Sequence, residues 1–301
     1  LADQTSNADI PSYVATKAEW SSDAAFVAGI QHALPQGAMV YQYPFVPFPE
    51  NPPVVNMADY DEMKGWLHSS TLRWSYGAFK GSVVAEWQPR LNQFPLEIVV
   101  PTLAMIGFQG VTVDRAGYTD HGLSFEGSLS AIAPGPGLTS GNGLLSFFDL
   151  QALEARVRGQ VSDADRQAIA QAALDLPAVT AGTGFYPLAG AGPGSSWWSE
   201  RKGTLDLMSP VDQQLVLRTR LVGPVGTITL QFPDGTQDKA PVSPAGIDYV
   251  HPFRVKAGVS SVTLATDGPQ IASPGDSRVL FFQLKDPAIT GVAFDGFALG
   301  A

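Results

Sequence analysis

The chain has 301 residues, which is enough for one large domain or two ordinary ones. Its formal net charge of −10 argues against binding to a nucleic-acid backbone, and the absence of cysteine excludes disulfides, a thiolate nucleophile and a cysteine-ligated zinc site. Only 15% of the residues are charged, so we expect a largely neutral polar surface, which suits sugars or a neighbouring protein surface.

Residues 1–18 are polar and are expected to form a loose lead-in to an α/β domain over 19–180. Helical and strand-like patterns alternate along that domain. The expected helices cover 20–34, 59–68, 96–108, 123–132, 150–158 and 162–174, and the expected strands cover 38–43, 72–76, 111–114 and 144–150. This alternation predicts a Rossmann-like layered domain with a largely parallel sheet, whose ligand-facing edge lies at the carboxyl ends of the strands.

Residues 181–196 are rich in Gly, Ala and Pro and are expected to be a linker. From 197 to 301, short segments alternate apolar and polar residues and are separated by turn signals such as that at 233–235. This pattern predicts an antiparallel β-sandwich domain of the jelly-roll or carbohydrate-binding-module-like type.

No membrane span is expected, because the most apolar run, 94–108, is interrupted by Pro95, Glu97 and Pro101 and falls short of ~20 apolar residues. No signal peptide is visible, and the chain begins with Leu1 rather than Met. We therefore expect a processed product or a fragment of something longer.

The common catalytic and cofactor motifs are missing or incomplete. No Gly-x-Ser-x-Gly elbow occurs, and Ser195 stands where a dinucleotide fingerprint over 190–195 needs Gly, so no cofactor is expected. No histidine has a second one three to five residues away, which excludes a helix-borne metal pair. Asp59 and Asp61 could share a divalent ion or complement a helix dipole, and the second interpretation is favoured, so no metal is expected.

The densest aromatic feature lies after these acids and comprises Trp66, His68, Arg73, Trp74, Tyr76, Phe79 and Lys80. Aromatic faces beside charged groups suit a sugar, whereas a half-buried strand would use the same rings as core. Trp197 and Trp198 are neighbours on a strand and point to opposite faces. One is expected in the core, and the other is available to a ligand or, as favoured, to packing between domains. The candidate sugar-binding residues are therefore Asp59, Asp61, Trp66, His68, Arg73, Trp74, Tyr76, Lys80, Trp197 and Trp198. Asp120 and His121 beside Arg115 are read as ordinary loop polarity rather than an acid–base pair.

Several segments resemble one known family, namely LPQGAMVYQYPFVPFPE, ADYDEMKGWLHSSTLRWSYGAFKG, GFQGVTVDRAGYTD and GLLSFFDL. They are similar to the region after the last transmembrane helix of large bacterial polytopic membrane proteins, the GT-C-type glycosyltransferases and sugar or phosphoglycerol transferases. The later GFYPLAG and WWSERKGTLDLMSP resemble the β-sandwich that closes such chains. The matched pieces cover most of 20–210, and 72–77 is the most specific of them.

The resemblance implies an extracytoplasmic region, on the periplasmic or cell-envelope side, tethered to the plasma membrane through its own transmembrane part. Such enzymes use a lipid-linked sugar donor, and their catalytic acid lies on a loop among the membrane helices, so no catalytic residue carries over to this chain. The leading hypothesis is a domain that binds or presents a cell-envelope glycan acceptor. Two alternatives stay open: a free-standing carbohydrate-active enzyme using Asp59, Asp61, Asp114 or Asp120, and an assembly domain that docks on membrane helices.

Overall fold

The computed structural model describes residues 12–133, 137–187, 195–272 and 275–299. The chain forms two compact units, one from 1–82 with 107–159 and the other from 83–106 with 160–301. We call them the α/β unit and the sandwich unit. This division differs from the expected one, because residues 83–106 and the strands that follow residue 177 belong to the sandwich unit. Of the expected lead-in and linker, residues 1–11 and 188–194 lie outside the described residues.

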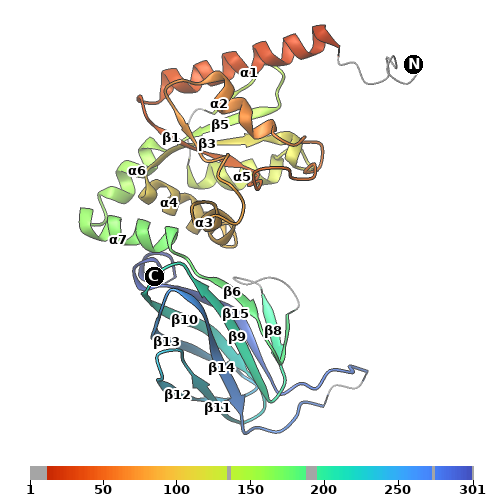
Figure 1. Cartoon of the computed structure of the whole chain (residues 1–301), viewed down its shortest axis with the longest axis vertical. Coiled ribbons are helices and arrows are strands. Elements are labelled where there is room, and N and C mark those ends of the chain that lie inside the picture. Colours follow the sequence, from red (N-terminus) through yellow and green to blue (C-terminus); the bar gives the residue numbers. More distant parts are fainter. Residues whose placement is uncertain (1–11, 134–136, 188–194, 273–274, 300–301) are drawn as a thin grey trace. The chain divides into compact units, whose positions relative to one another are not determined.

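The α/β unit combines one sheet with helices and two 3-10 turns (Figure 1). Its helices and turns are α1 (Tyr13–Ala33), η3 (Asp61–Met63), α2 (Lys64–His68), η4 (Arg115–Gly117), α5 (Leu123–Ile132) and α6 (Gln151–Arg158). Its strands are β1 (Met39–Tyr43), β2 (Arg73–Trp74), β3 (Phe108–Asp114), β4 (Leu138–Thr139) and β5 (Leu145–Asp149). Helix α1 begins earlier than expected, because the Ser12 hydroxyl caps it by accepting the Ala15 N–H at 3.4 Å.

The sheet of the α/β unit is mixed, with the strand order β2-β1-β3-β5-β4. Strand β1 pairs in parallel with β2 and β3, as expected, but β5 runs antiparallel to β3. The reason lies in the hairpin that joins β4 to β5, in which Leu138 pairs with Phe147. The chain returns through this hairpin and inserts β5 between β3 and β4. The expected α/β layering with parallel pairing is present for β2, β1 and β3, but the sheet as a whole is mixed, and the expected Rossmann-like arrangement is not confirmed.

The core of the α/β unit lies between α1 and one face of the sheet. Phe26, Val27 and Ile30 of α1 are buried against Val40 of β1 and Phe147 of β5. On the other face, the Tyr43 ring meets Phe125 of α5 at 4.8 Å between ring centroids. Both faces of the sheet are thus covered, and the carboxyl ends of β1 and β3 remain as the place where polar groups gather.

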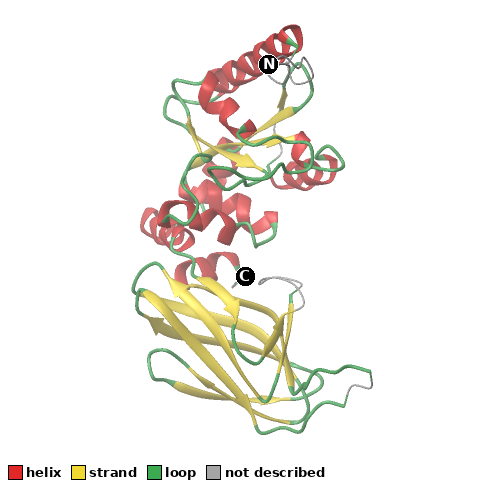
Figure 2. Ribbon diagram, turned by 45° about the vertical axis from the view of Figure 1, so that its right-hand side comes forward, coloured by secondary structure: helices red, strands yellow, loops and turns green. Residues whose placement is uncertain are grey.

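The sandwich unit consists of two facing sheets and a group of helices (Figure 2). Its helices are α3 (Val83–Leu91), α4 (Leu96–Ile106), α7 (Asp163–Leu174) and α8 (Val292–Ala298). Its strands are β6 (Ala178–Ala181), β7 (Phe185–Pro187), β8 (Ser196–Ser199), β9 (Lys202–Ser209), β10 (Gln213–Val222), β11 (Gly226–Gln231), β12 (Gln237–Val242), β13 (Ile247–Val255), β14 (Gly258–Thr266) and β15 (Phe282–Gly291). Helix α3 was not expected from the sequence.

The two sheets have the orders β13-β10-β15-β8-β7 and β12-β11-β14-β9-β6, and their neighbouring strands pair antiparallel. Leucine and phenylalanine side chains from both sheets form one buried cluster between them. The expectation of an antiparallel β-sandwich is confirmed. The strands β6 and β7 come from the segment that was expected to close the first domain and open the linker.

Across the described residues, no helix combines the length and the apolarity that a membrane crossing requires.

Candidate functional site

The α1 face of the sheet changes from apolar to polar towards the carboxyl ends of its parallel strands. Side chains alternate along a strand, so Val40 shares its face with Gln42, and Thr112 shares its face with Asp114. Gln42 and Thr112 are direct neighbours in the parallel register. All three polar side chains at this end are buried. A polar group in such a place needs partners, because burying it without hydrogen bonds costs several kcal/mol.

The turn η3 and helix α2 close this end of the sheet. Together with the strands and α1 they line a small cavity. We call it the polar pit after its polar lining residues, which are Gln42, Asp61, Glu62, Lys64, Trp74, Thr112 and Asp114; Phe26, Val27, Gly65 and Leu145 complete the lining. The cavity has a volume of about 20 Å³, which is room for one water-sized group and far less than a sugar ring needs. Asp61 and Lys64 are partly exposed and lie at its mouth, whereas Glu62 and Asp114 are buried.

The side chain of Gln42 in β1 forms hydrogen bonds with two other segments of the chain that surround the pit. Its Nε2 donates to the backbone oxygen of Glu62 at 2.6 Å and to Glu62 Oε2 at 2.7 Å. Its Oε1 accepts the backbone N–H of Tyr76 at 3.1 Å. A single amide thus connects β1 to the turn η3 and to the chain after β2, which fixes the position of the buried Glu62 carboxyl.

Lys64 is the cation of the pit. Its Nζ lies 3.2 Å from Glu19 Oε1 of α1 and 3.3 Å from Asp61 Oδ1. Burial opposes the charge of Lys64, but the carboxylates of Asp61, Asp114 and Asp23 outweigh that effect and raise its pKa. The ammonium therefore stays charged and offsets part of the negative charge around it.

The two buried carboxyl groups of the pit, Glu62 and Asp114, are held towards their protonated forms. Burial raises the pKa of Asp114 to about 6, against the opposing effects of Lys64 and of the Ala116 N–H that donates to its carboxylate. Burial also raises the pKa of Glu62 well above its usual value, and the charge of Asp114 adds to this. Acids of this kind can donate as well as accept a hydrogen bond at mildly acidic pH.

Four buried polar atoms around the pit have no hydrogen-bond partner among the described residues. They are Glu62 Oε1 and Trp74 Nε1, whose residues line the cavity, and Asp23 Oδ1 and the Tyr76 hydroxyl, which are buried nearby. Most buried polar groups in folded proteins are paired, so such a concentration marks the end of the sheet as a place that accepts a polar guest.

Beside the pit lies a group of rings that we call the aromatic platform, formed by Phe48, Tyr60, Tyr76 and Phe79. The Phe48 ring centroid is 6.0 Å from that of Tyr60, 5.5 Å from that of Tyr76 and 5.2 Å from that of Phe79. Tyr60 is 41% exposed and Phe79 is 64% exposed. Tyr60 and Phe79 each meet Phe48 edge-on, at an interplanar angle of 73°, so the group exposes apolar ring faces to solvent without forming one flat plane.

Charged groups border the platform. The Lys80 backbone N–H donates to the Phe48 oxygen at 2.6 Å, and its Nζ donates to the Glu50 oxygen at 3.2 Å. Burial raises the pKa of Tyr76 to about 12, and the neighbouring Asp59 carboxylate contributes to the shift. The platform and the pit are joined through Tyr76, whose ring belongs to the platform and whose N–H is held by Gln42 of the pit.

The structure brings together part of the residue set expected from the sequence. Two of them, Asp61 and Trp74, line the pit, and the ring of Tyr76 belongs to the platform. Asp59 and Lys80 border the platform.

The other members of the set that lie in this unit are elsewhere. Trp66 is 63% exposed on α2, and the His68 ring contacts Trp20 of α1 at 4.2 Å between centroids. Arg73 pairs with Met39, the first residue of β1, and its Nε donates to the Gly37 oxygen at 2.8 Å. Arg73 therefore lies at the amino end of the parallel strands and does not line the pit.

The two neighbouring tryptophans belong to the sandwich unit. Trp197 is 2% exposed and lies in the core, with its ring 6.2 Å from that of Phe185. Its inclusion among sugar-binding residues is corrected, because a buried indole offers no surface to a ligand. Trp198 is half-buried on the outer side of its sheet, opposite Tyr186 and Gln283.

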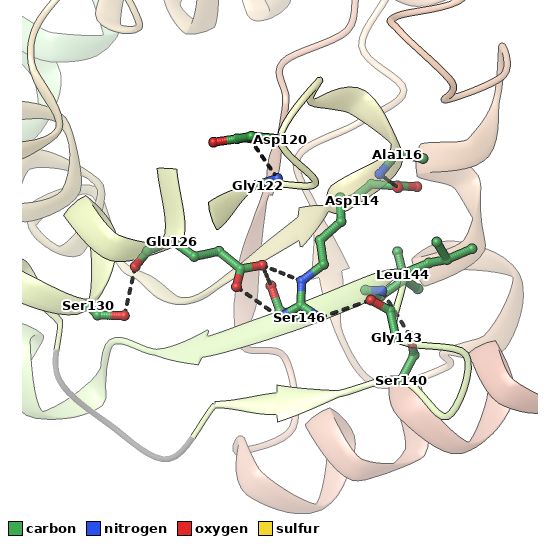
Figure 3. Close-up of polar contacts among 12 residues, drawn as sticks. Asp114, Ala116, Asp120, Gly122, Glu126, Ser130, Ser140, Gly143, Leu144 and Ser146 are labelled. Carbon is green, nitrogen blue, oxygen red and sulfur yellow. Dashed lines mark hydrogen bonds and ion pairs between the residues drawn. The ribbon is translucent and has the colours of Figure 1, made fainter. Parts of the chain in front are cut away.

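The acidic loop after β3 has a structural role (Figure 3). The Arg115 guanidinium donates to Glu126 Oε1 at 2.7 Å and to Oε2 at 2.8 Å, and the Ser146 hydroxyl donates to the same carboxylate. Asp120 accepts the N–H groups of Gly122 and Ser124 at the start of α5. Within the described parts of the chain, no three His, Asp or Glu side chains converge as metal ligands would.

Sequence reasoning missed most of the pit and half of the platform. Gln42 is the only non-aliphatic, non-aromatic side chain in the strand MVYQY, which was a usable signal. Phe48 lies in a proline-rich stretch that was read only as an irregular connection. Glu62 and Lys64 look like surface residues of a short helix until the fold turns them towards the strand ends.

The comparisons with known proteins concern carbohydrate-binding modules. No protein-family model matches the sequence, and no curated relative does. Similar solved structures include a CBM6 module of Cellvibrio mixtus lichenase 5A in complex with cellotriose, at 11% identity and a TM-score of 0.26, covering 39% of this chain and 98% of that one. A family 35 module from Clostridium thermocellum has 10% identity and a TM-score of 0.24, covering 38% of this chain and 93% of that one. At TM-scores of this size, function has to be argued from the residues of this chain.

Proposed function

We propose that the chain binds a glycan on the aromatic platform of the α/β unit. The observation that carries the proposal is the contact of Phe48 with the exposed rings of Tyr60 and Phe79, bordered by Lys80 and Asp59. The C–H face of a sugar ring packs on an aromatic face, while its hydroxyls bind charged donors and acceptors at the edge. Few other ligands combine an apolar face with a hydroxylated rim.

The wider role follows from the resemblance to membrane-bound transferases. In this proposal the chain is the extracytoplasmic part of a GT-C-type glycosyltransferase, and the platform holds the acceptor glycan while the sugar comes from a lipid-linked donor. Catalysis would then reside in a part of the enzyme outside these 301 residues. The low fraction of charged residues in the chain suits an uncharged glycan, and Lys80 and Asp59 at the border of the platform supply a donor and an acceptor for its hydroxyls.

Titration of the chain with cell-envelope oligosaccharides tests binding. We expect saturable binding that Tyr60→Ala and Phe79→Ala each weaken about tenfold, which corresponds to about 1.4 kcal/mol. Trp66→Ala is the matched control, because Trp66 is equally exposed in the same unit but is not part of the platform. No binding at millimolar sugar, or equal losses in all three variants, would overturn the proposal.

The membrane context has its own test. Reading the gene upstream of the codon for Leu1 should reveal an open frame with several apolar spans of about 20 residues. A start codon followed directly by a secretion signal would contradict the transferase context and leave the glycan-binding proposal to stand alone.

A carbohydrate-active enzyme is the second candidate, and one observation favours it. Burial raises the pKa of Asp114 to about 6, which is a suitable value for a general acid near neutral pH. A turnover screen on chromogenic glycosides with Asp114→Asn and Glu62→Gln as controls decides the matter. Hydrolysis that both substitutions abolish would favour this candidate, whereas the small volume of the pit leads us to expect none.

A further inference from the structure

We propose that the polar pit is a subsite for a single neutral hydroxyl or hydroxymethyl group of the sugar that lies on the aromatic platform. The inference rests on the proposed glycan binding and adds to it the chemical group that is recognised. It begins from a pair of buried atoms, Glu62 Oε1 and Trp74 Nε1, that have no hydrogen-bond partner among the described residues and whose residues line the same cavity.

The two atoms have complementary chemistry. The indole Nε1–H of Trp74 can only donate, and Glu62 Oε1 accepts a hydrogen bond when the carboxyl is ionised. A hydroxyl group satisfies both at once, since its oxygen accepts from the indole and its proton is donated to the carboxyl. When Glu62 is protonated, its carboxyl O–H can instead donate to the hydroxyl oxygen of the sugar, so the hydrogen bond is kept with donor and acceptor exchanged.

The volume of the pit limits the size of the chemical group that can bind in it. A volume of about 20 Å³ takes one hydroxyl group and excludes a ring, so the sugar ring itself has to stay outside. The aromatic platform is the surface that can hold it there. Asp61, at the mouth of the pit, directly follows Tyr60 of the platform in the chain, and Tyr76 connects the two through the Gln42 amide.

The charges around the pit select a neutral group. Asp61, together with Asp114 once the pH exceeds its pKa of about 6, would repel a carboxylate, sulfate or phosphate on the sugar. Lys64 already occupies the position of a cation, paired with Asp61 and Glu19. Placing a second charge of either sign in this buried space would cost more than a hydroxyl does. Uronic acids and phosphorylated sugars are therefore expected to bind less tightly than neutral sugars of the same size.

The test uses a panel of neutral hexose and pentose oligosaccharides together with a uronic acid oligosaccharide, titrated against the whole chain. The variants Trp74→Phe and Glu62→Gln each remove one hydrogen-bonding function at nearly constant volume. Trp66→Phe makes the same chemical change outside the pit and serves as the control. Thermal unfolding of each variant verifies the fold, and the NMR resonance of the Trp74 indole N–H reports directly on the pit in the unmodified chain.

We expect both pit variants to weaken the tightest neutral oligosaccharide at least fivefold, and the Trp74 indole resonance to shift on binding. A deoxy analogue lacking the recognised hydroxyl should bind the pit variants and the unmodified chain equally. The pit proposal is refuted if binding depends on Tyr60 and Phe79 but is unchanged in both pit variants and the indole resonance does not shift. The proposed glycan binding on the platform is kept in that case. Absence of any binding across the panel overturns the platform and the pit together.

Discussion

The backbone of Gly65 lies directly against the indole ring of Trp74. A Cβ atom added at residue 65 would stand 2.6 Å from two atoms of that ring, closer than packed atoms approach. Helix α2 can therefore lie on the indole only because residue 65 has no side chain. This close approach positions Glu62 and Lys64, which directly precede the glycine in the chain, over the ends of the strands.

Substitution of Gly65 by alanine is expected to destabilise the α/β unit by about 1–2 kcal/mol, because overpacking outweighs the better helix propensity of alanine. Urea-induced unfolding measures the change. Gly127→Ala in α5 is the matched control, since a Cβ there meets nothing within 4 Å, and it should be neutral or stabilising by up to about 1 kcal/mol. Equal effects at the two positions would contradict the contact between Gly65 and Trp74.

Asp114 should make the stability of the α/β unit decrease as the pH rises. Burial raises its pKa to about 6 in the folded chain, from 3.8 as an isolated group, so the folded state binds the proton more tightly than the unfolded state does. The stabilisation is complete below pH 3.8 and is lost progressively up to about pH 6. The full effect corresponds to about 3 kcal/mol.

Asp114→Asn is expected to remove this dependence while keeping an oxygen for the Ala116 N–H. Unfolding free energies of both proteins at pH 4 and pH 7 provide the measurement. Only their difference is compared, because carboxyls that do not interact with Asp114 titrate equally in both; Glu62, whose pKa the charge of Asp114 raises, is part of the effect that the substitution removes. The variant should gain stability relative to the parent as the pH rises. A difference that is constant with pH would show that Asp114 titrates as an ordinary carboxyl.

The ion pair between Arg115 and Glu126 should contribute substantially to stability. Both side chains are mostly buried, and Ser146 shares the carboxylate. Glu126→Ala leaves the guanidinium and the hydroxyl without this partner, at an expected cost of about 2–3 kcal/mol. Lys256→Ala removes the exposed pair with Asp212 and should cost less than about 1 kcal/mol. Chemical denaturation of both variants tests the contrast, which a similar loss in each would refute.

Truncation of the two adjacent tryptophans of β8 should lower the stability by very different amounts. Trp197→Ala empties a core position and is expected to cost about 3–5 kcal/mol, whereas Trp198→Ala removes a half-buried outer side chain and should cost less than half of that. Thermal unfolding of the two variants measures the difference. If the losses are equal, the assignment of the inward face of β8 is wrong.

The elements with strong local signals were predictable from the sequence. Helix α7 follows its capping pattern, with the Ser162 hydroxyl accepting the Asp165 N–H at 3.1 Å, and α5 spans the expected residues. The direction of β5 was not predictable, because an apolar strand has the same periodicity in either direction. It depends on the hairpin after β4, a strand of only two residues that was itself not expected.

The site was only half predictable, because closeness in sequence is a poor guide to closeness on a strand. Arg73 and Trp74 are neighbours on a two-residue strand, and their side chains point to opposite faces, so Arg73 binds the Gly37 oxygen while Trp74 lines the pit. Gln42 and Asp114 are far apart in the chain and meet only through parallel pairing of β1 with β3. Interactions of that kind become visible when the register is known.

The two units are interleaved along the polypeptide, since the chain passes between them at 82–83, 106–107 and 159–160. On the ribosome, β1 emerges long before its parallel partner β3, and the helices α3 and α4 of the other unit are made in between. The α/β unit can therefore complete its sheet only after part of the sandwich unit has been synthesised. A single genetic crossover that transfers one unit whole therefore carries along or cuts off part of the other unit.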